Sequence, residues 1–378
     1  MSKRYLDLHV LQTLPPSNVN RDDTGSPKSA TFGGTRRARV SSQAWKRAIR
    51  LDFRERLQPE QLGIRSKRLV GRIAESIAAE APELESESRQ LAQKLLESLG
   101  LKAEKTSRAG KVAESADTAP ELQYLVFLSN QQIQNLAEYA VATAQAGEAP
   151  TKKAVQAIAK TDHSVDIALF GRMVADLSDL RVDAAAQVAH ALSVHPVETE
   201  FDYFTAVDDI ENEAHAGAGM IGNVEFNSST LYRYATLDVS ALREALGDAA
   251  VTFEAIDAFV QSFVRSMPTG KQNTFAHRTL PHAVVATLRS DQPINLVGAF
   301  EDPARASGST TLLLSAATKL ADHARQLDTT YPPAEEPTRW VAVAHPDAEP
   351  LASLGSVGSV SDLVAGVREA ISTEVSAT

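Results

Sequence analysis

The chain has 378 residues, enough for two or three domains, and is 43% hydrophobic and 23% charged. This mix is typical of a globular protein and excludes wholesale disorder and fibrous repeats. Because the chain has no cysteine, it cannot form disulfides, zinc–thiolate sites, iron–sulfur clusters or a thiol nucleophile, and a reducing cytoplasm is the expected location. No apolar signal-peptide segment and no run of about 18 apolar residues is found, so no membrane partner is expected.

The net charge of −10 argues against a nucleic-acid partner, but its distribution argues for one. Between Arg21 and Arg50 the chain carries eight basic and two acidic residues. The basic ones are Arg21, Lys28, Arg36, Arg37, Arg39, Lys46, Arg47 and Arg50. Such a run is either a solvated surface or a specific polyanion site, since phosphates respond to the local potential and not to the net charge.

Alternating hydrophobicity predicts a first strand from Tyr5 to Gln12. Aliphatic side chains occupy one face of this strand, while Asp7 and His9 mark the other face, which we expect to be open. Residues 13–39 have no periodicity and many turn formers, which predicts a long loop. Long loops in compact domains are usually functional or disordered, and this one carries half of the basic cluster.

A helix is predicted to follow, with Ser42 as its N-cap and its end near Leu57. At 100° per residue, its polar and apolar side chains fall on opposite faces. The polar face comprises Gln43, Lys46, Arg47, Arg50 and Arg54, and the apolar face Ala44, Trp45, Ala48 and Ile49. A merely solvated helix would mix charge signs, so this pattern favours polyanion binding.

From about residue 59 to residue 180 the composition shifts to helix formers, which predicts a helical insertion with a low-complexity piece at 102–120. The expected helices are 67–80, 83–99, 130–144, 152–159 and 164–177.

Beyond the insertion, the pattern predicts alternating strands and helices. The expected strands are 184–194, 201–206, 231–239, 283–289, 293–300 and 339–344. The expected helices are 251–267 and a C-terminal one from near Ser361, capped by Ser359 and Asp362. Without the insertion, strand–helix–strand occurs twice, which is the split βαβ order of the ferredoxin-like and RNA-recognition fold.

An irregular segment, 208–227, interrupts this second part and holds three glycines around Met220 and Ile221. Glycines that flank two apolar residues predict either a projecting hairpin or a hairpin tip buried in its own core.

Chemically, a polyphosphate backbone requires several separated cations, and N–H groups of a glycine-rich loop or a helix start add donors. Residues 20–50 provide both, with Asn20-Arg21-Asp22-Asp23, Phe32-Gly33-Gly34-Thr35-Arg36-Arg37 and Val40-Ser41-Ser42-Gln43-Ala44-Trp45-Lys46-Arg47. This block closely resembles the CasC family, the backbone subunit of the type I-E CRISPR surveillance complex Cascade. Similar family motifs are Phe170-Gly171-Arg172-Met173, Ala184-Ala185-Ala186-Gln187-Val188-Ala189-His190-Ala191, Asp202-Tyr203-Phe204-Thr205-Ala206-Val207-Asp208-Asp209, Leu231-Tyr232-Arg233-Tyr234-Ala235 and Gly270-Lys271-Gln272-Asn273-Thr274-Phe275-Ala276.

The resemblance implies an α+β, hand-shaped protein with a modified RNA-recognition palm, a helical fingers insertion and a thumb β-hairpin. The palm would comprise 1–58 and 181–378, the fingers 59–180, and the thumb about 197–228. Several copies would polymerise along the guide RNA spacer and present it to target DNA.

The resemblance also implies the residues that contact nucleic acid. The RNA-binding set is Asn20, Arg21, Lys28, Ser41, Gln43, Lys46, Arg50, Met173, Met220, Ile221, Lys271, Gln272 and Asn273. Met173 and either Ile221 or Met220 would bracket a flipped nucleotide, since an apolar side chain can hold an unstacked gap open. For the loop at Lys271 a surface turn is the alternative. Lys152, Lys153 and Lys160 share one helical face and would contact target DNA, with solvated lysines as the alternative.

The implied partners are crRNA, the target DNA strand, other copies of this chain, and the large, small, guide-end-capping and crRNA-processing subunits of Cascade. The helicase–nuclease effector would be an indirect partner. Guide–target pairing reads the sequence while the protein reads backbone and shape, so no catalytic residue, metal or cofactor is expected.

Two other functions compete with this interpretation. A metal-dependent nuclease could use Asp208, Asp209 and Glu211 as ligands, with His277 and His282 nearby in sequence. A general single-strand-binding protein would carry aromatic platforms on its sheet, and an aromatic content of 6% argues against it.

Overall fold

The computed structural model describes residues 3–104, 120–173, 178–206 and 220–376. The chain divides into two compact units. The first comprises Met1–Asp52, Ala186–Ser240 and Ile256–Thr378, and the second comprises Phe53–Ala185 and Ala241–Ala255. The combination of a large sheet with many helices confirms the α+β class.

The first unit is built on a mixed sheet to which ten strands contribute within the described ranges, in the order β14-β13-β12-β1-β11-β9-β3-β2 with β8 and β10 also paired to β11. The strands are β1 (Tyr5–Ser17), β2 (Ser29–Phe32), β3 (Thr35–Val40), β8 (Ala186–Val188), β9 (Ala191–Ser193), β10 (Glu200–Ala206), β11 (Met220–Asp238), β12 (Ala283–Arg289), β13 (Thr338–Val343) and β14 (Ser356–Val357). β1 is antiparallel to both neighbours, with Leu8 opposite Ala235 on β11 and Ala286 on β12.

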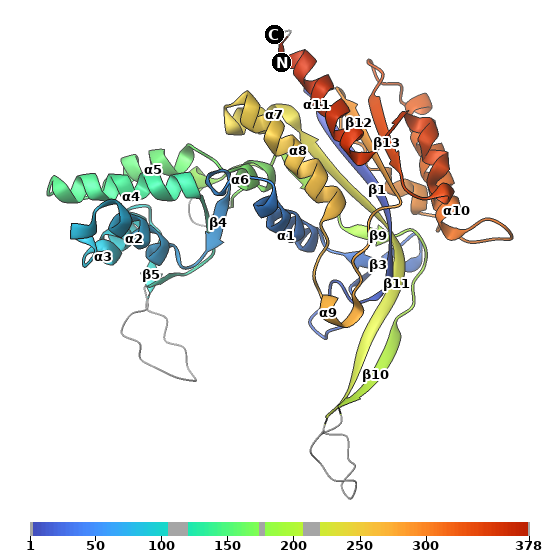
Figure 1. Cartoon of the computed structure of the whole chain (residues 1–378), viewed down its shortest axis with the longest axis horizontal. Helices are drawn as coiled ribbons and strands as arrows, with labels where there is room; N and C mark the ends of the chain where they lie inside the picture. Colours follow the sequence, from blue (N-terminus) through green and yellow to red (C-terminus); the bar gives the residue numbers. More distant parts are fainter. Residues whose placement is uncertain (1–2, 105–119, 174–177, 207–219, 377–378) are drawn as a thin grey trace, which may run out of the picture. The chain divides into compact units, whose positions relative to one another are not determined.

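Helices cover both faces of this sheet (Figure 1). On one face lie α1 (Ser42–Asp52), α8 (Ala249–Arg265) and α11 (Val360–Ser376). Arg233 of β11 contacts Trp45 of α1 and Phe263 of α8 there, and Trp340 of β13 packs on Gly366 of α11. On the other face, α10 (Leu312–Thr330) packs on β1, β11 and β12 through an apolar cluster.

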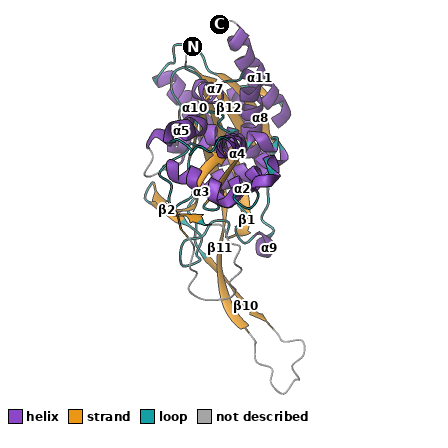
Figure 2. Cartoon of the chain, turned by 90° about the vertical axis from the view of Figure 1, so that its left-hand side faces the viewer, coloured by secondary structure: helices purple, strands orange, loops and turns teal. Residues whose placement is uncertain are grey.

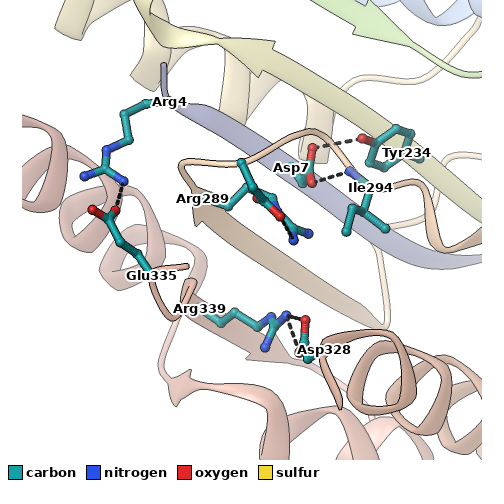
Figure 3. A network of polar contacts seen from close by, with 9 residues as sticks. Arg4, Asp7, Tyr234, Arg289, Ile294, Asp328, Glu335 and Arg339 are labelled. Atoms are coloured by element: carbon teal, nitrogen blue, oxygen red, sulfur yellow. Dashed lines mark hydrogen bonds and ion pairs between the residues drawn. The ribbon is translucent and has the colours of Figure 1, made fainter. Parts of the chain in front are cut away.

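The expected open face of β1 is therefore wrong, because α10, which the sequence did not predict, covers it. Asp7 and His9 are buried. Figure 3 shows how the Asp7 carboxylate is satisfied, since Tyr234 Oη donates to one oxygen and Ile294 N to the other, both at 2.9 Å. Burial raises the pKa of Asp7 and lowers that of His9 to about 3, so His9 is neutral.

Several expected boundaries change in the structure. The expected loop 13–39 contains the end of β1 and the β2–β3 hairpin, because β3 pairs with β9. The expected strand 293–300 is wrong, because Leu296–Phe300 form a 3-10 turn whose first residues are capped by Asn295. The C-terminal cap is confirmed, since Ser359 N and Oγ donate to Asp362 Oδ2 at 2.8 and 2.7 Å.

β10 and the first part of β11 form a hairpin that extends beyond the rest of the sheet (Figures 1 and 2). Phe204 and Gly222 lie opposite each other, and an added Cβ at Gly222 would lie 2.6 Å from the Phe204 ring. Gly222 therefore leaves room for the aromatic ring across the hairpin. Residues 207–219, which join the two strands, lie outside the described residues.

The second unit is mostly helical, with a continuous apolar core. Its elements are α2 (Leu69–Glu80), α3 (Ser88–Ser98), α4 (Asn130–Gln145), α5 (Lys152–Lys160), α6 (Val165–Phe170), β4 (Gly63–Ser66), β5 (Ala103–Glu104), β6 (Glu121–Leu122) and β7 (Val126–Ser129). A capping box between Ser129 and Gln132 starts α4. The last expected helix, 164–177, ends at Phe170, because Gly171 takes a φ of 78° and stops it.

Among the remaining described helices, α7 (Val239–Leu246) precedes α8, α9 (Gln272–Phe275) is a single turn, and a 3-10 stretch at Pro346–Leu354 precedes β14. Short 3-10 turns also lie at Phe53–Glu55, Pro59–Gln61, Pro82–Leu84 and Ser178–Leu180. Among the residues described, no helix combines the length and apolar character needed to cross a membrane.

Candidate nucleic-acid interface

The loop after β1 is tied to the start of α1 by hydrogen bonds that involve three of the predicted RNA-binding residues. Ser41 N donates to Asn20 Oδ1 at 2.8 Å, and Lys28 N donates to Asn20 O at 2.9 Å. Ser41 Oγ accepts from Ala44 N at 3.3 Å, so Ser41, and not the expected Ser42, caps α1. Asn20, Lys28 and Ser41 are thus held close together.

The basic face predicted for α1 is present in the structure. Trp45, Ala48 and Ile49 are buried. On the other side, Gln43 and Arg47 are exposed while Lys46 and Arg50 are half-buried. Burial lowers the pKa of Lys46. The helix ends at Asp52, earlier than predicted, so Arg54 belongs to a following 3-10 turn and not to this face.

The buried Arg233 side chain packs against Trp45 on the apolar side of α1, a contact that the sequence alone did not indicate. Its guanidinium stacks 3.7 Å from the Trp45 ring centroid and 4.7 Å from that of Phe263. Nη1 donates to Gln12 Oε1 at 2.6 Å, and Nη2 donates to Phe263 O. Burial lowers the pKa of Arg233 to about 9. This cation joins α1, β11 and α8, which sets the position of the basic face.

Arg37, one of the eight cations counted in the basic run, is not available to a ligand, because its side chain is fully buried. Its guanidinium donates to the carbonyls of Ser193, at 3.1 Å, and Phe300, at 2.9 Å, and to Thr35 Oγ1 at 2.8 Å. Arg37 therefore binds the β2–β3 hairpin to β9 and to the turn before Glu301. The basic surface is smaller than the sequence count suggests.

The loop that carries Lys271, Gln272 and Asn273 packs against the loop after β1. A Cβ added at Gly270 would lie 2.3 Å from the carbonyl oxygen of Val19, so the two backbones touch. Figure 1 shows α9 beside the lower part of β11. Although Lys271 and Asn20 are far apart in sequence, the fold brings their segments side by side.

This second loop is also conformationally unusual. Lys271 and Ala276 have positive φ values of 54° and 46°, which side chains other than glycine rarely adopt. Phe275 holds the loop against the base of the hairpin, with its ring centroid 5.8 Å from that of Phe226. Asn18 completes this junction by donating to Glu225 O at 2.8 Å.

Gly270→Ala tests whether this close approach matters. We expect RNA affinity to fall several-fold and the free energy of unfolding to fall by about 1–3 kcal/mol, because the methyl group must push the 271–273 loop away from Val19. Gly308→Ala is the control for adding a methyl group to a loop glycine, since its Cβ position is open; its φ of 57° adds a backbone strain that Gly270→Ala does not have. Fluorescence anisotropy measures the RNA affinity of both variants, and thermal melts measure their stability. Equal RNA affinities for both variants would contradict a role for the 271–273 loop.

In the second unit, Met173 is 85% exposed and directly follows a rigidly held arginine. The buried Arg172 side chain donates to the carbonyls of Leu180 and Ala159, both at 2.7 Å, and to Gln132 Oε1 at 3.2 Å. Its main chain exchanges two 2.9 Å hydrogen bonds with Val182. Desolvation lowers the pKa of Arg172 to about 10. Met173 is thus an exposed apolar side chain on a firmly held backbone, which suits its predicted role as a wedge that holds an unstacked gap in the RNA open.

Lys152, Lys153 and Lys160 are exposed along α5. The buried residues Val155 and Ala159 face the core, so the helix presents the three cations to solvent. They form a surface of the second unit that is compatible with the predicted contact to a nucleic-acid backbone.

The predicted thumb residues Met220 and Ile221 begin β11, with their backbones opposite Ala206 and Thr205 of β10. The side chains of Met220 and Ile221 lie outside the described set. The hairpin also carries two aromatic residues that sequence reasoning overlooked, since Phe201 and Tyr203 are 67% and 62% exposed. They share one face of β10, and their alternate spacing was the signal that could have revealed them.

The described residues show no arrangement that would support a metal-dependent nuclease. Asp208, Asp209 and Glu211 lie outside the described residues. His277 is buried, with Nε2 3.1 Å from Pro268 O, while the ring of His282 packs edge-on against His345. Within the ranges that the structure covers, no group of three or more histidine and carboxylate side chains could hold a metal ion.

Comparison with known proteins places the chain in a family. It is similar to a chain of a solved structure described as "CRISPR RNA-guided surveillance complex, pre-nicking", with 35% identity, a TM-score of 0.81, and 96% of this chain and 99% of that chain covered. A second, described as "CRISPR RNA-guided surveillance complex", has 29% identity, a TM-score of 0.71, and coverages of 97% and 99%. No curated protein sequence matches. The sequence profile of the CT1975-like proteins matches residues 6–365, and the chain therefore belongs to the CT1975-like protein family.

Proposed function

We propose that the chain is a non-catalytic, crRNA-binding backbone subunit of a CRISPR surveillance complex of the Cascade type I-E. Copies of it polymerise along the guide RNA spacer and present the guide for pairing with target DNA in antiviral defence. The observation that carries this proposal is the junction of the Asn20 loop, the basic face of α1 and the Lys271 loop on one unit. The two similar structures, whose descriptions name RNA-guided surveillance complexes, support it.

The strand order supports assigning the first unit as an RNA-recognition palm. Four successive neighbours, β12, β1, β11 and β9, are antiparallel. α1 lies in the chain between β1 and β9, and α8 between β11 and β12. This order is consistent with the split βαβ arrangement of the ferredoxin-like fold and supports the proposal. The second unit is then the fingers, and the β10–β11 hairpin the thumb that reaches a neighbouring copy.

The chemistry of the interface favours backbone recognition over base reading. Lys28, Lys46 and Arg50 provide separated cations, while Asn20 and Gln43 provide amides that can reach phosphate or sugar oxygens. Such contacts hold a strand in register and carry no sequence information. Met173, with the thumb residues Met220 and Ile221, would keep an unstacked position open between bound segments.

The proposal also includes the other partners that the family resemblance implies. The lysines of α5 contact the target DNA strand, and the large, small, guide-end-capping and crRNA-processing subunits complete the complex. Catalysis is left to a separate helicase–nuclease effector.

Native mass spectrometry of the chain with single-stranded RNAs of increasing length tests the proposal, with Mg²⁺ present in the same mixtures. We expect the number of bound copies to rise in even steps with RNA length while the RNA stays intact. One copy at every length would contradict polymerisation. Cleaved RNA would contradict the non-catalytic role and direct attention to Asp208 and Asp209.

A further inference from the structure

Three nitrogen-bearing side chains from separate segments meet beside β3. Arg39 Nη1 lies 3.3 Å from His190 Nδ1, and Arg39 Nε donates to Ser29 O at 3.2 Å. Lys28 is close enough for its charge to act on His190. Because a guanidinium only donates, His190 Nδ1 accepts in this contact, and the ring proton is on Nε2. His190 thus keeps an N–H group on its far side that can donate to a ligand.

The charges of this cluster favour an anionic ligand. Burial, then the charge of Arg39, then that of Lys28 lower the pKa of His190, so both charges acting on it are positive. His190 is exposed, while Arg39 and Lys28 are half-buried. Gathering like charges at a surface costs free energy unless a ligand of opposite charge binds there.

The cluster continues the interface described above. Arg39 N donates to Lys28 O, and Lys28 N donates to Asn20 O, both at 2.9 Å. Arg39 also precedes Ser41 by two residues, which in an extended strand is roughly 7 Å. A hollow beside Lys28 and Arg39, which does not include His190, is lined by apolar residues such as Leu14 and Val40 and by the polar residues Ser17, Asn20, Lys28, Arg39, Asn227 and Ser229.

We infer that Lys28, Arg39 and His190 form a subsite for one phosphodiester group of the bound RNA strand. The Lys28 ammonium and the Arg39 guanidinium supply the charge, and the neutral His190 ring supplies an Nε2–H donor. The inference rests on the proposed RNA-binding function and adds Arg39 and His190 to the interface. A strand, and not a free phosphate, is the ligand because the cluster is continuous with Asn20 and Ser41.

The test measures the affinity of the full chain for single-stranded RNA by fluorescence anisotropy at several salt concentrations. We expect His190→Ala to weaken binding by about threefold to tenfold, the value of one hydrogen bond. His190→Gln should restore most of that loss, since its amide N–H can replace Nε2–H. Arg39→Met should weaken binding more and reduce the salt slope by about 0.7, the effect of one phosphate contact.

His323→Ala is the matched control, because His323 is a half-buried histidine on α10, on the opposite face of the sheet. It should bind RNA like the unchanged chain. Thermal melts of all variants identify any loss that comes from unfolding. Equal affinities for His190→Ala and His323→Ala would overturn the subsite.

Ring-proton NMR of His190 gives a second readout, with a short RNA and inorganic phosphate as the two probes. We expect the RNA to shift this resonance and to raise the pKa of His190, while inorganic phosphate at the same phosphate concentration leaves it unchanged. An equal shift with inorganic phosphate would mean a free-anion site and overturn the inference.

The two proposals fail in different ways. If the unchanged chain does not bind RNA, the proposed function is wrong. If it binds in even steps but the His190 resonance does not move, only the subsite is wrong.

Discussion

Replacing both Lys46 and Arg50 by glutamate is expected to lower RNA affinity by about a hundredfold or more at physiological salt. Each substitution removes a phosphate contact and puts a like charge in its place. Because single-stranded nucleic acids give a salt slope of about 0.7 per contact, the slope should fall by about 1.4. The apolar side of α1, with Trp45 and Ile49, is unchanged, so the fold should remain.

Anisotropy titrations over a range of salt concentrations measure this effect, and circular dichroism checks the fold. Arg305→Glu with Arg325→Glu is the charge-matched control. Arg325 lies on α10, on the other face of the sheet, in an exposed ion pair with Asp322 that contributes little to stability. An equal loss of affinity in the control would mean a general charge effect, and an unaltered affinity in the first variant would refute the basic face.

Arg172→Met is expected to destabilise the second unit by about 3 kcal/mol. The guanidinium donates to the carbonyls of Leu180, Ala159 and Phe127 and to the side chain of Gln132. Methionine has a similar length but no donor, so all four acceptors lose the bond from Arg172, although Ala159 O and Gln132 Oε1 keep their bonds from Gln132 Nε2 and Ser129 N. Because Met173 follows directly, the wedge should also lose its fixed position.

Urea denaturation, followed by circular dichroism, measures the change. Arg181→Met is the control, because Arg181 forms an exposed ion pair with Asp183 and should change the free energy of unfolding by less than about 0.5 kcal/mol. The free energy of unfolding of Arg172→Lys should lie between that of the unchanged chain and that of Arg172→Met, because an ammonium can donate to some of these acceptors. If Arg172→Met were no less stable than Arg181→Met, Arg172 would not hold this part of the chain.

RNA labelled with 2-aminopurine at the positions that the proposed function leaves unstacked beside Met173 would report on this residue separately. Arg172→Lys should reduce the fluorescence of these bases while overall RNA affinity stays close to that of the unchanged chain. A fluorescence equal to that of the unchanged chain would mean that the wedge does not depend on Arg172.

Predictions from the sequence succeeded where a short stretch of chain determines the structure. The face of α1 that carries Lys46 and Arg50 follows from the helical period and the apolar residues opposite. The C-terminal cap follows from the spacing of Ser359 and Asp362. Strand β12 follows from a short run rich in apolar and β-branched residues. None of these features requires knowledge of the distant chain.

Predictions failed where a distant segment changes the environment of a residue. Asp7 and His9 are polar and alternate with aliphatic residues, yet α10, some 300 residues later, buries them. Arg37 has the same sequence signature as Arg36, but carbonyls near residue 300 capture its guanidinium. Pro293–Phe300 has the apolar composition of a strand, but Leu296–Phe300 form a 3-10 turn, and Leu296 and Phe300 pack in the apolar cluster that also holds residues of α10.

The sequence by itself determined the α+β class, the basic stripe of α1 and the family resemblance, because helical periodicity and motif spacing are local properties. Only the tertiary structure decided which cations remain available, that the loops of Asn20 and Lys271 touch, and that His190 meets Arg39. These contacts join residues separated by about 150 to 250 positions, and they depend on strand register and loop packing. Local sequence patterns do not determine which distant residues come into contact. Which residues make up the site is therefore decided only when the sheet has assembled.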